Sequence, residues 1–150
     1  MKRQSTKSPK LLALVLAAWL AGILFPLAWF SRSDPVLKAW FDRTFATDLA
    51  HVAMHSALYA VLAVLVLALA RRQGYRMPTF FSAIDLAVGV TVVVGVLQEG
   101  LQLLPLGRRF GWPEIYDLGV DLAAAIVAAV LIQLWRRRRV HGERVENPYD

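Results

Sequence analysis

The chain has 150 residues, of which 57% are hydrophobic and none is cysteine, and its formal net charge is +6. A soluble domain of this length could not bury so much apolar surface, and the absence of cysteine excludes disulfides, thiolate metal sites and cysteine nucleophiles. Because the basic residues flank apolar blocks, they indicate membrane topology and contact with anionic lipid head groups, and they disfavour nucleic acid as a partner.

Four apolar blocks long enough to cross a bilayer follow one another along the chain. The first, Leu11–Phe30, follows a basic segment, and its ~20 residues at 1.5 Å each span roughly 30 Å. We interpret it as an uncleaved anchor, because no small-residue cleavage site lies at its end; a cleaved signal peptide is the alternative. The other three blocks cover residues 49–70, 81–104 and 115–135, and the arginine run 136–139 ends the last one. These blocks predict four transmembrane helices.

The segment Ser31–Asp48, between the first two blocks, predicts a short amphipathic helix that lies on the outer leaflet. Its large apolar side chains recur at helical spacing; they are Val36, Leu37, Trp40, Phe41 and Phe45. A helix with one such face lies in the membrane interface instead of crossing the bilayer.

Lysine and arginine are concentrated in the N-terminal segment, in the loop 71–78 and after Trp135. The positive-inside rule therefore places both termini and that loop in the cytoplasm, and residues 31–48 and 105–114 outside. We predict an all-α, multi-pass protein of the bacterial cytoplasmic membrane. Its single domain, 1–150, has both ends inside, and residues 136–150 form a polar cytoplasmic tail.

Ionisable and amide side chains interrupt the last three apolar blocks. A charged group within a spanning helix costs a few kcal/mol, so each must be paired, hydrated or functional. The set comprises His51, His55, Tyr59, Gln98, Glu99, Gln102, Asp117 and Asp121. Within each block the spacing places these groups on one helix face. It is i, i+4, i+8 in the second block, i, i+3 from Glu99 to Gln102 in the third, and i, i+4 in the fourth.

The predicted topology brings these polar groups to the same depth in the outer leaflet. Arg108 and Arg109 lie in the loop between the third and fourth helices, where they could fold over the cluster and pair with Glu99 or Asp117. We therefore predict one outward-facing polar pocket between the second, third and fourth helices. Asp85 lies near the cytoplasmic end of its helix and is assigned no role.

Two sequence elements in these blocks resemble the VanZ-like family. The stretch His55-Ser-Ala-Leu-Tyr59 resembles its His-x-x-x-Tyr element, and Glu99-Gly-Leu-Gln102-Leu-Leu-Pro-Leu-Gly-Arg108 resembles its Glu-x-x-Gln-x5-Arg signature. Asp117 resembles the acidic residue that opens the family's last helix. The resemblance covers roughly residues 48–132.

The sequence departs from the family pattern at three positions. His51 stands where the family commonly has Asp, and Asp121 and Ala124 stand where it has Asn and Gly. The resemblance implies a bacterial cell-envelope protein, associated in some members with teicoplanin resistance, and it implies no defined reaction.

Several functions fit the predicted pocket, and whether the protein is an enzyme stays open. The favoured one is binding of an anionic lipid or lipid-linked glycan head group, with membrane lipids or a cell-wall or polysaccharide precursor as partners. A hydrolase or transferase acting on a lipid-linked phosphate or glycan is the second; Arg108 or Arg109 would hold phosphate, and Glu99, His55 or Asp117 would move protons.

A third interpretation is purely structural, in which the polar groups only hold the helix bundle together. Helix packing alone does not require buried charge, because small residues of the third and fourth blocks already allow close approach, and this disfavours the structural interpretation. These residues are Gly89, Gly95, Ala123, Ala124, Ala125, Ala128 and Ala129. A metal site is the fourth, because His51 and His55 at i, i+4 can present two imidazoles to one ion, with Glu99, Asp117 or Asp121 as further ligands. Without a third histidine or a His-Glu-x-x-His motif, we predict neither a metal nor any other cofactor.

Overall fold

The computed structural model describes residues 9–25, 34–44, 46–75, 80–104 and 107–146. These residues form helices and turns, with no strand among them. The helices are α1 (Pro9–Leu24), α3 (Pro35–Thr44), α4 (Asp48–Arg72), α5 (Phe80–Leu103) and α6 (Trp112–Glu146).

Within the described ranges, α4, α5 and α6 are each long and apolar enough to cross a membrane. The apolar helix α1 is shorter, with 16 residues; the rest of the first predicted block, residues 26–30, lies outside the described part of the chain. Many large apolar side chains are exposed on the outer faces, among them Val93 on α5 and Leu131 on α6. An apolar exterior around packed helices is the architecture of a helical membrane protein.

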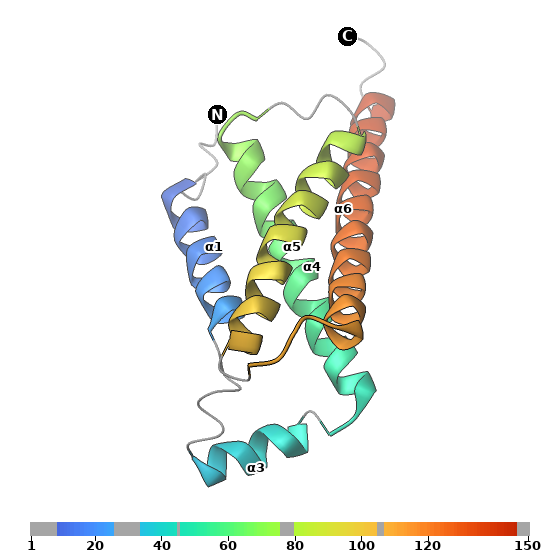
Figure 1. Ribbon diagram of the computed structural model, residues 1–150. Helices are drawn as coiled ribbons and strands as arrows, with labels where there is room; N and C mark the ends of the chain where they lie inside the picture. The colour runs from blue at the N-terminus through green and yellow to red at the C-terminus, as the bar shows by residue number, and fades with distance from the viewer. Residues whose placement is uncertain (1–8, 26–33, 45, 76–79, 105–106, 147–150) are drawn as a thin grey trace.

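The long helices alternate in direction (Figure 1). Helices α4 and α6 run the same way and α5 runs against them. The α4–α5 connection therefore lies at one end of the bundle and the α5–α6 connection at the other. Helix α6 packs most extensively on α4 and also on α5, while α1 packs on α4 and α5. The helix α3 falls within the predicted segment 31–48 and lies across the bundle at the end where α4 begins (Figure 1).

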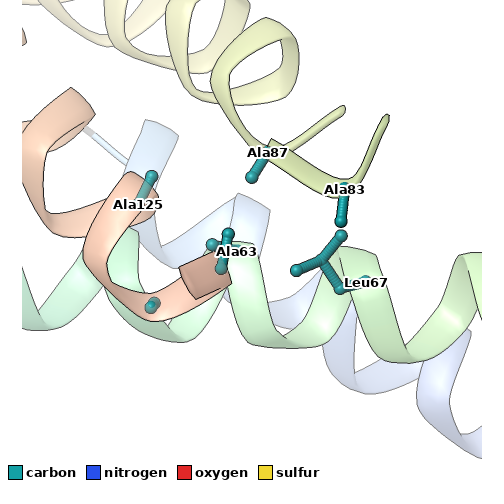
Figure 2. Packing of buried hydrophobic residues seen from close by; sticks show 7 residues of the cluster. Ala63, Leu67, Ala83, Ala87 and Ala125 are labelled. Atoms are coloured by element: carbon teal, nitrogen blue, oxygen red, sulfur yellow. The ribbon is translucent and has the colours of Figure 1, made fainter. Parts of the chain in front are cut away.

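Small residues let α4, α5 and α6 approach closely in the half of the bundle where α4 ends. Figure 2 shows Ala63 and Leu67 of α4 meeting Ala83 and Ala87 of α5 and Ala125 of α6. Close helix approach gains van der Waals contact that lipid cannot supply. Five alanines of the fourth block were predicted to allow close packing. Ala125, Ala128 and Ala129 are buried, Ala124 is half-buried and Ala123 is exposed. The other half of the bundle contains the contacts of His51, His55 and Tyr59 with polar residues of α5 and α6.

Helix α6 is longer than the predicted apolar block at both ends. It begins at Trp112, where the Glu114 side chain accepts a hydrogen bond from the Gly111 backbone N–H at 2.8 Å, which is half of a capping box. It continues beyond Trp135 to Glu146, through residues predicted as a polar tail. Arginine and glutamate are good helix formers and no proline interrupts this stretch, so the helix continues beyond its apolar part.

Candidate functional site

Two histidine–carboxylate pairs connect α4 to α6. The Nε2 atom of His51 lies 3.1 Å from Oδ1 of Asp117, and Nδ1 of His55 lies 2.9 Å from Oδ1 of Asp121. Both partners are spaced i, i+4 on helices that run in the same direction, so the two pairs form successive rungs between the helices. The structure thus brings together four of the predicted site residues.

The two pairs differ in burial. The His51 and Asp117 side chains are 41% and 17% exposed, whereas those of His55 and Asp121 are 3% and 0% exposed. The two imidazole rings lie next to each other, with centroids 4.5 Å apart. The pairs therefore lead from an accessible position into the buried interior of the bundle.

A third polar contact continues the α4 stripe towards α5. The Tyr59 hydroxyl donates a hydrogen bond of 2.7 Å to Oε1 of Gln98, and both residues are buried. Gln98 is one of the polar residues noted in the third apolar block, and it shares a face with Gln102 at i, i+4, but no partner was predicted for it. Gln102 itself is half-buried.

Glu99 is buried and lies within electrostatic range of His55, Asp117 and Asp121. Of the two oxygens of Asp121, Oδ2 has no hydrogen-bond partner among the described residues. Three carboxylates thus share this part of the bundle with two imidazoles. Burying several carboxylates together costs free energy within a membrane protein, because water is not available there to solvate their charges.

Arg108 and Arg109 are exposed at the beginning of the segment that leads into α6. The Arg108 guanidinium forms an ion pair with Glu114 at 3.9 Å, while no ion pair joins it to Glu99 or Asp117 in the described structure. The reason is local: Glu114 caps the first turn of α6 and lies closer along the chain. Glu114 was not among the predicted site residues, although an acidic residue just after Pro113 is a typical helix start.

An open cavity of about 480 Å³ lies beside the outer pair, His51 and Asp117. It is lined by Ala46, Thr47, Asp48, His51, Val52, Pro113, Tyr116 and Asp117. Thr47 also caps α4, since its hydroxyl accepts a hydrogen bond from the Ala50 backbone N–H at 3.2 Å. The lining residues come from the starts of α4 and α6, and of these only His51 and Asp117 belonged to the predicted site.

An apolar groove of about 510 Å³ follows the contact between α4 and α6. It is lined by Val52, Ser56, Ala60, Val120, Ala123, Ala124, Val127, Ala128 and Leu131. Val52 lines both the polar cavity and this groove. The polar cavity and the apolar groove therefore meet at Val52.

The residues beside the cavity can perform two kinds of chemistry. An imidazole held by a carboxylate can take up or release a proton in a fixed orientation. The same imidazoles and carboxylates are also ligands for divalent metals, and one ligand atom from each of His51, His55 and Asp117 lies within 4.8 Å of the other two.

No protein-family model, curated protein or solved structure matches this chain. The resemblance to the VanZ-like family therefore stays a prediction that rests on the motifs at His55, Glu99 and Asp117.

Proposed function

We propose that this protein spans the bacterial cytoplasmic membrane four times, with both ends inside, and binds an anionic lipid or lipid-linked glycan. The head group occupies the outward-facing cavity at the starts of α4 and α6, and an acyl or polyprenyl chain lies in the groove between these helices. The observation that carries the proposal is that Val52 lines both spaces.

The shape of the combined site favours an amphiphile. A hydrocarbon chain gains little binding free energy by leaving lipid for an apolar groove. The groove therefore positions the chain more than it adds affinity. The polar cavity supplies the specific contacts, because hydrogen bonds are directional and depend on the chemical groups of the ligand. A ligand that is polar at one end only can use both parts at once.

The polar groups of the cavity favour a glycan, and an arginine near the start of α6 favours a phosphate attached to it. Asp48, Asp117, Thr47 and Tyr116 line the cavity, and their oxygens suit the hydroxyl groups of a sugar. The exposed guanidinium of Arg108, next to the first turn of α6, suits a phosphate. We therefore place the sugar inside the cavity and the phosphate beside Arg108.

The VanZ-like motifs support a role in the cell envelope. If the bound molecule is a cell-wall or polysaccharide precursor, occupancy of the site changes how glycopeptides reach their target. Deleting the coding sequence in its host is then expected to alter teicoplanin susceptibility, measured as the minimal inhibitory concentration. Complementation with the wild type, and not with the Val52→Trp variant, is expected to restore it.

The binding proposal is tested by identifying the lipids that co-purify with the protein. Wild type, Val52→Trp and Val93→Trp are purified in a mild detergent and their lipid extracts are analysed by mass spectrometry. Val93 is the matched control, because it is an exposed apolar residue on α5 and does not line the groove. We expect an anionic or glycan-bearing lipid to be enriched with wild type and Val93→Trp, and depleted with Val52→Trp. Identical lipid profiles for the three proteins would contradict the proposal.

A second candidate, hydrolysis or transfer at a lipid-linked phosphate, is favoured by the buried His55–Asp121 pair. An imidazole oriented by a carboxylate is the arrangement that general-base catalysis uses. The test incubates the protein in nanodiscs with a polyprenyl-diphosphate-linked glycan and measures the products by mass spectrometry. Turnover by wild type and by Asp85→Asn, but not by Glu99→Gln, would support catalysis, while no turnover by wild type would leave binding as the function.

A further inference from the structure

We infer that His51, His55 and Asp117 form a binding site for one divalent transition-metal ion, of the Zn²⁺ class, with its open coordination position towards the cavity. This inference stands on the ligand geometry and does not depend on lipid binding. It differs from the expectation drawn from the sequence, which lacks a zinc motif because the third ligand lies 62 or more residues away from either histidine along the chain.

The distances place His51 and Asp117 at the spacing of two bound ligands, and the third ligand close enough to join them by side-chain movement. Nε2 of His51 and Oδ1 of Asp117 are 3.1 Å apart, close to the roughly 3.3 Å between two ligands of a tetrahedral ion with bonds of about 2.0–2.1 Å. The three ligand atoms lie within 4.8 Å of one another. Because all ligands of a tetrahedral ion are roughly 3.3 Å apart, the widest pair must close by up to about 1.5 Å when an ion binds.

Asp121 supplies the support that metal-binding histidines need. Its Oδ1 lies 2.9 Å from Nδ1 of His55, and both side chains are almost fully buried. This contact holds the imidazole so that Nε2 is left for the ion, as in the carboxylate–histidine–metal arrangement of known sites. Asp121 is therefore a positioning residue, and Asp117 is the carboxylate that would coordinate the ion.

The charge of the surroundings independently favours a cation. Glu99, Asp117 and Asp121 lie within electrostatic range of one another. In the described structure no lysine or arginine forms an ion pair with any of the three. The buried oxygen Oδ2 of Asp121 also lacks a hydrogen-bond partner in the described part of the chain. A divalent ion would balance this negative charge where hydration cannot.

The ligand set selects the class of ion. Two imidazoles and one carboxylate suit Zn²⁺ and its neighbours in the transition series, whereas Mg²⁺ and Ca²⁺ prefer oxygen ligands alone. The fourth position would face the cavity lined by His51 and Asp117, where water or a phosphate or hydroxyl oxygen of a ligand could enter. Three protein ligands with one open position are typical of sites at which zinc acts on a bound molecule.

The test measures Zn²⁺ binding to untagged, chelator-treated protein in detergent. Titration calorimetry compares the wild type with His51→Gln, Asp117→Asn and Asp85→Asn. Elemental mass spectrometry after desalting gives the number of zinc ions bound per chain. Both ligand variants are chosen for retained folding, since His51 is partly exposed and asparagine can still hydrogen-bond to it. Size-exclusion chromatography checks that each remains monodisperse.

We expect one Zn²⁺ per chain for wild type and Asp85→Asn, and a loss of affinity of about 100-fold or more for His51→Gln and Asp117→Asn. Asp121→Asn is expected to weaken binding by about 10–100-fold. Substitution with Co²⁺ separates a positioning role from a ligand role, because its absorption spectrum should keep the wild-type band pattern in Asp121→Asn and lose it in His51→Gln. No Zn²⁺ binding by wild type, or binding that is unchanged in both ligand variants, would overturn the inference.

Discussion

The Nδ1 atom of His55 and the Oδ1 atom of Asp121 lie 2.9 Å apart, and this contact joins α4 to α6 in the buried interior of the bundle. Neither group can replace its partner with water there, so the pair determines the register between the two helices. The outer pair, His51 and Asp117, lies one helical turn away in the same register. The cavity and its candidate ligands therefore depend on this buried contact.

Separating the buried pair is expected to destabilise the bundle through the partner that remains. His55→Ala and Asp121→Ala should each lower the free energy of unfolding by roughly 1–3 kcal/mol, because a buried polar group loses its hydrogen bond. The double variant should cost less than the sum of the two, with a coupling energy of about 1 kcal/mol, within the range of interhelical hydrogen bonds in membranes. Unfolding by dodecyl sulfate in mixed micelles measures these values. Asp85→Ala is the exposed control, and strict additivity would show that the pair contributes nothing.

Gly95 lies where α5 meets the polar contacts of α4 and α6. An added Cβ would lie 2.8 Å from Cδ1 of Leu118, 3.5 Å from the Tyr59 hydroxyl and 3.6 Å from Oδ2 of Asp121. The Leu118 methyl group is the end of a flexible side chain, so we expect Gly95→Ala to change stability by less than about 1 kcal/mol. Gly95→Leu has no such escape and should cost on the order of 1–3 kcal/mol through overpacking.

The matched control for this position is Gly89 on the same helix, where an added Cβ would meet nothing within 4 Å. Gly89→Leu is therefore expected to unfold at nearly the wild-type dodecyl sulfate concentration. Equal losses for leucine at both positions would show that crowding near Tyr59 and Asp121 is not the cause.

The two partners of the Arg108–Glu114 ion pair are expected to have different roles. Glu114 is nearly buried and caps α6 through the Gly111 N–H, so Glu114→Ala should lower stability by roughly 0.5–2 kcal/mol. Arg108 is 60% exposed in this pair, and an exposed ion pair contributes about 0–1 kcal/mol. Arg108→Ala should thus leave the thermal unfolding midpoint in detergent nearly unchanged. A larger loss for Arg108→Ala than for Glu114→Ala would contradict this assignment.

The proposed orientation can be tested by single-cysteine labelling, because the natural chain has no cysteine. Trp40→Cys on α3 and Tyr75→Cys after α4 replace exposed residues at opposite ends of α4. In spheroplasts, a membrane-impermeant maleimide is expected to label position 40, and to label position 75 only after permeabilisation. The reverse pattern would place the cavity in the cytoplasm.

Much of the fold could be predicted because apolar length alone defines a membrane-spanning block. The blocks 49–70 and 81–104 became α4 (Asp48–Arg72) and α5 (Phe80–Leu103), within two residues at each end. The end of α6 could not be predicted in this way, because hydropathy marks where lipid contact stops and not where the backbone leaves the helix. Whether the first block spans the membrane depends partly on residues 26–30, which lie outside the described structure.

The polar stripe on α4 could be predicted from spacing, but the partners of its members could not. The pairing of His51 with Asp117 and of His55 with Asp121 depends on the axial offset between α4 and α6. Shifting one helix by a turn would leave only one such pair, His55 with Asp117 or His51 with Asp121. The same holds for Gln98, which contacts Tyr59 because of how α5 is rotated. The groove along Val52 was not predicted at all, since it arises from small residues that two helices place side by side.

Photolabelling with a chain-labelled lipid tests the amphiphile site most directly. A polyprenyl phosphate with a diazirine in its apolar chain is added to the protein in nanodiscs, irradiated, and located by peptide mass spectrometry. We expect the label on α4 between Val52 and Ala60 and on α6 between Val120 and Leu131, reduced by excess unlabelled lipid and by Val52→Trp. Equal labelling of the exposed α5 residues Val96 and Leu97, without competition, would show that the chain contacts only bulk lipid-facing surface and would contradict the account.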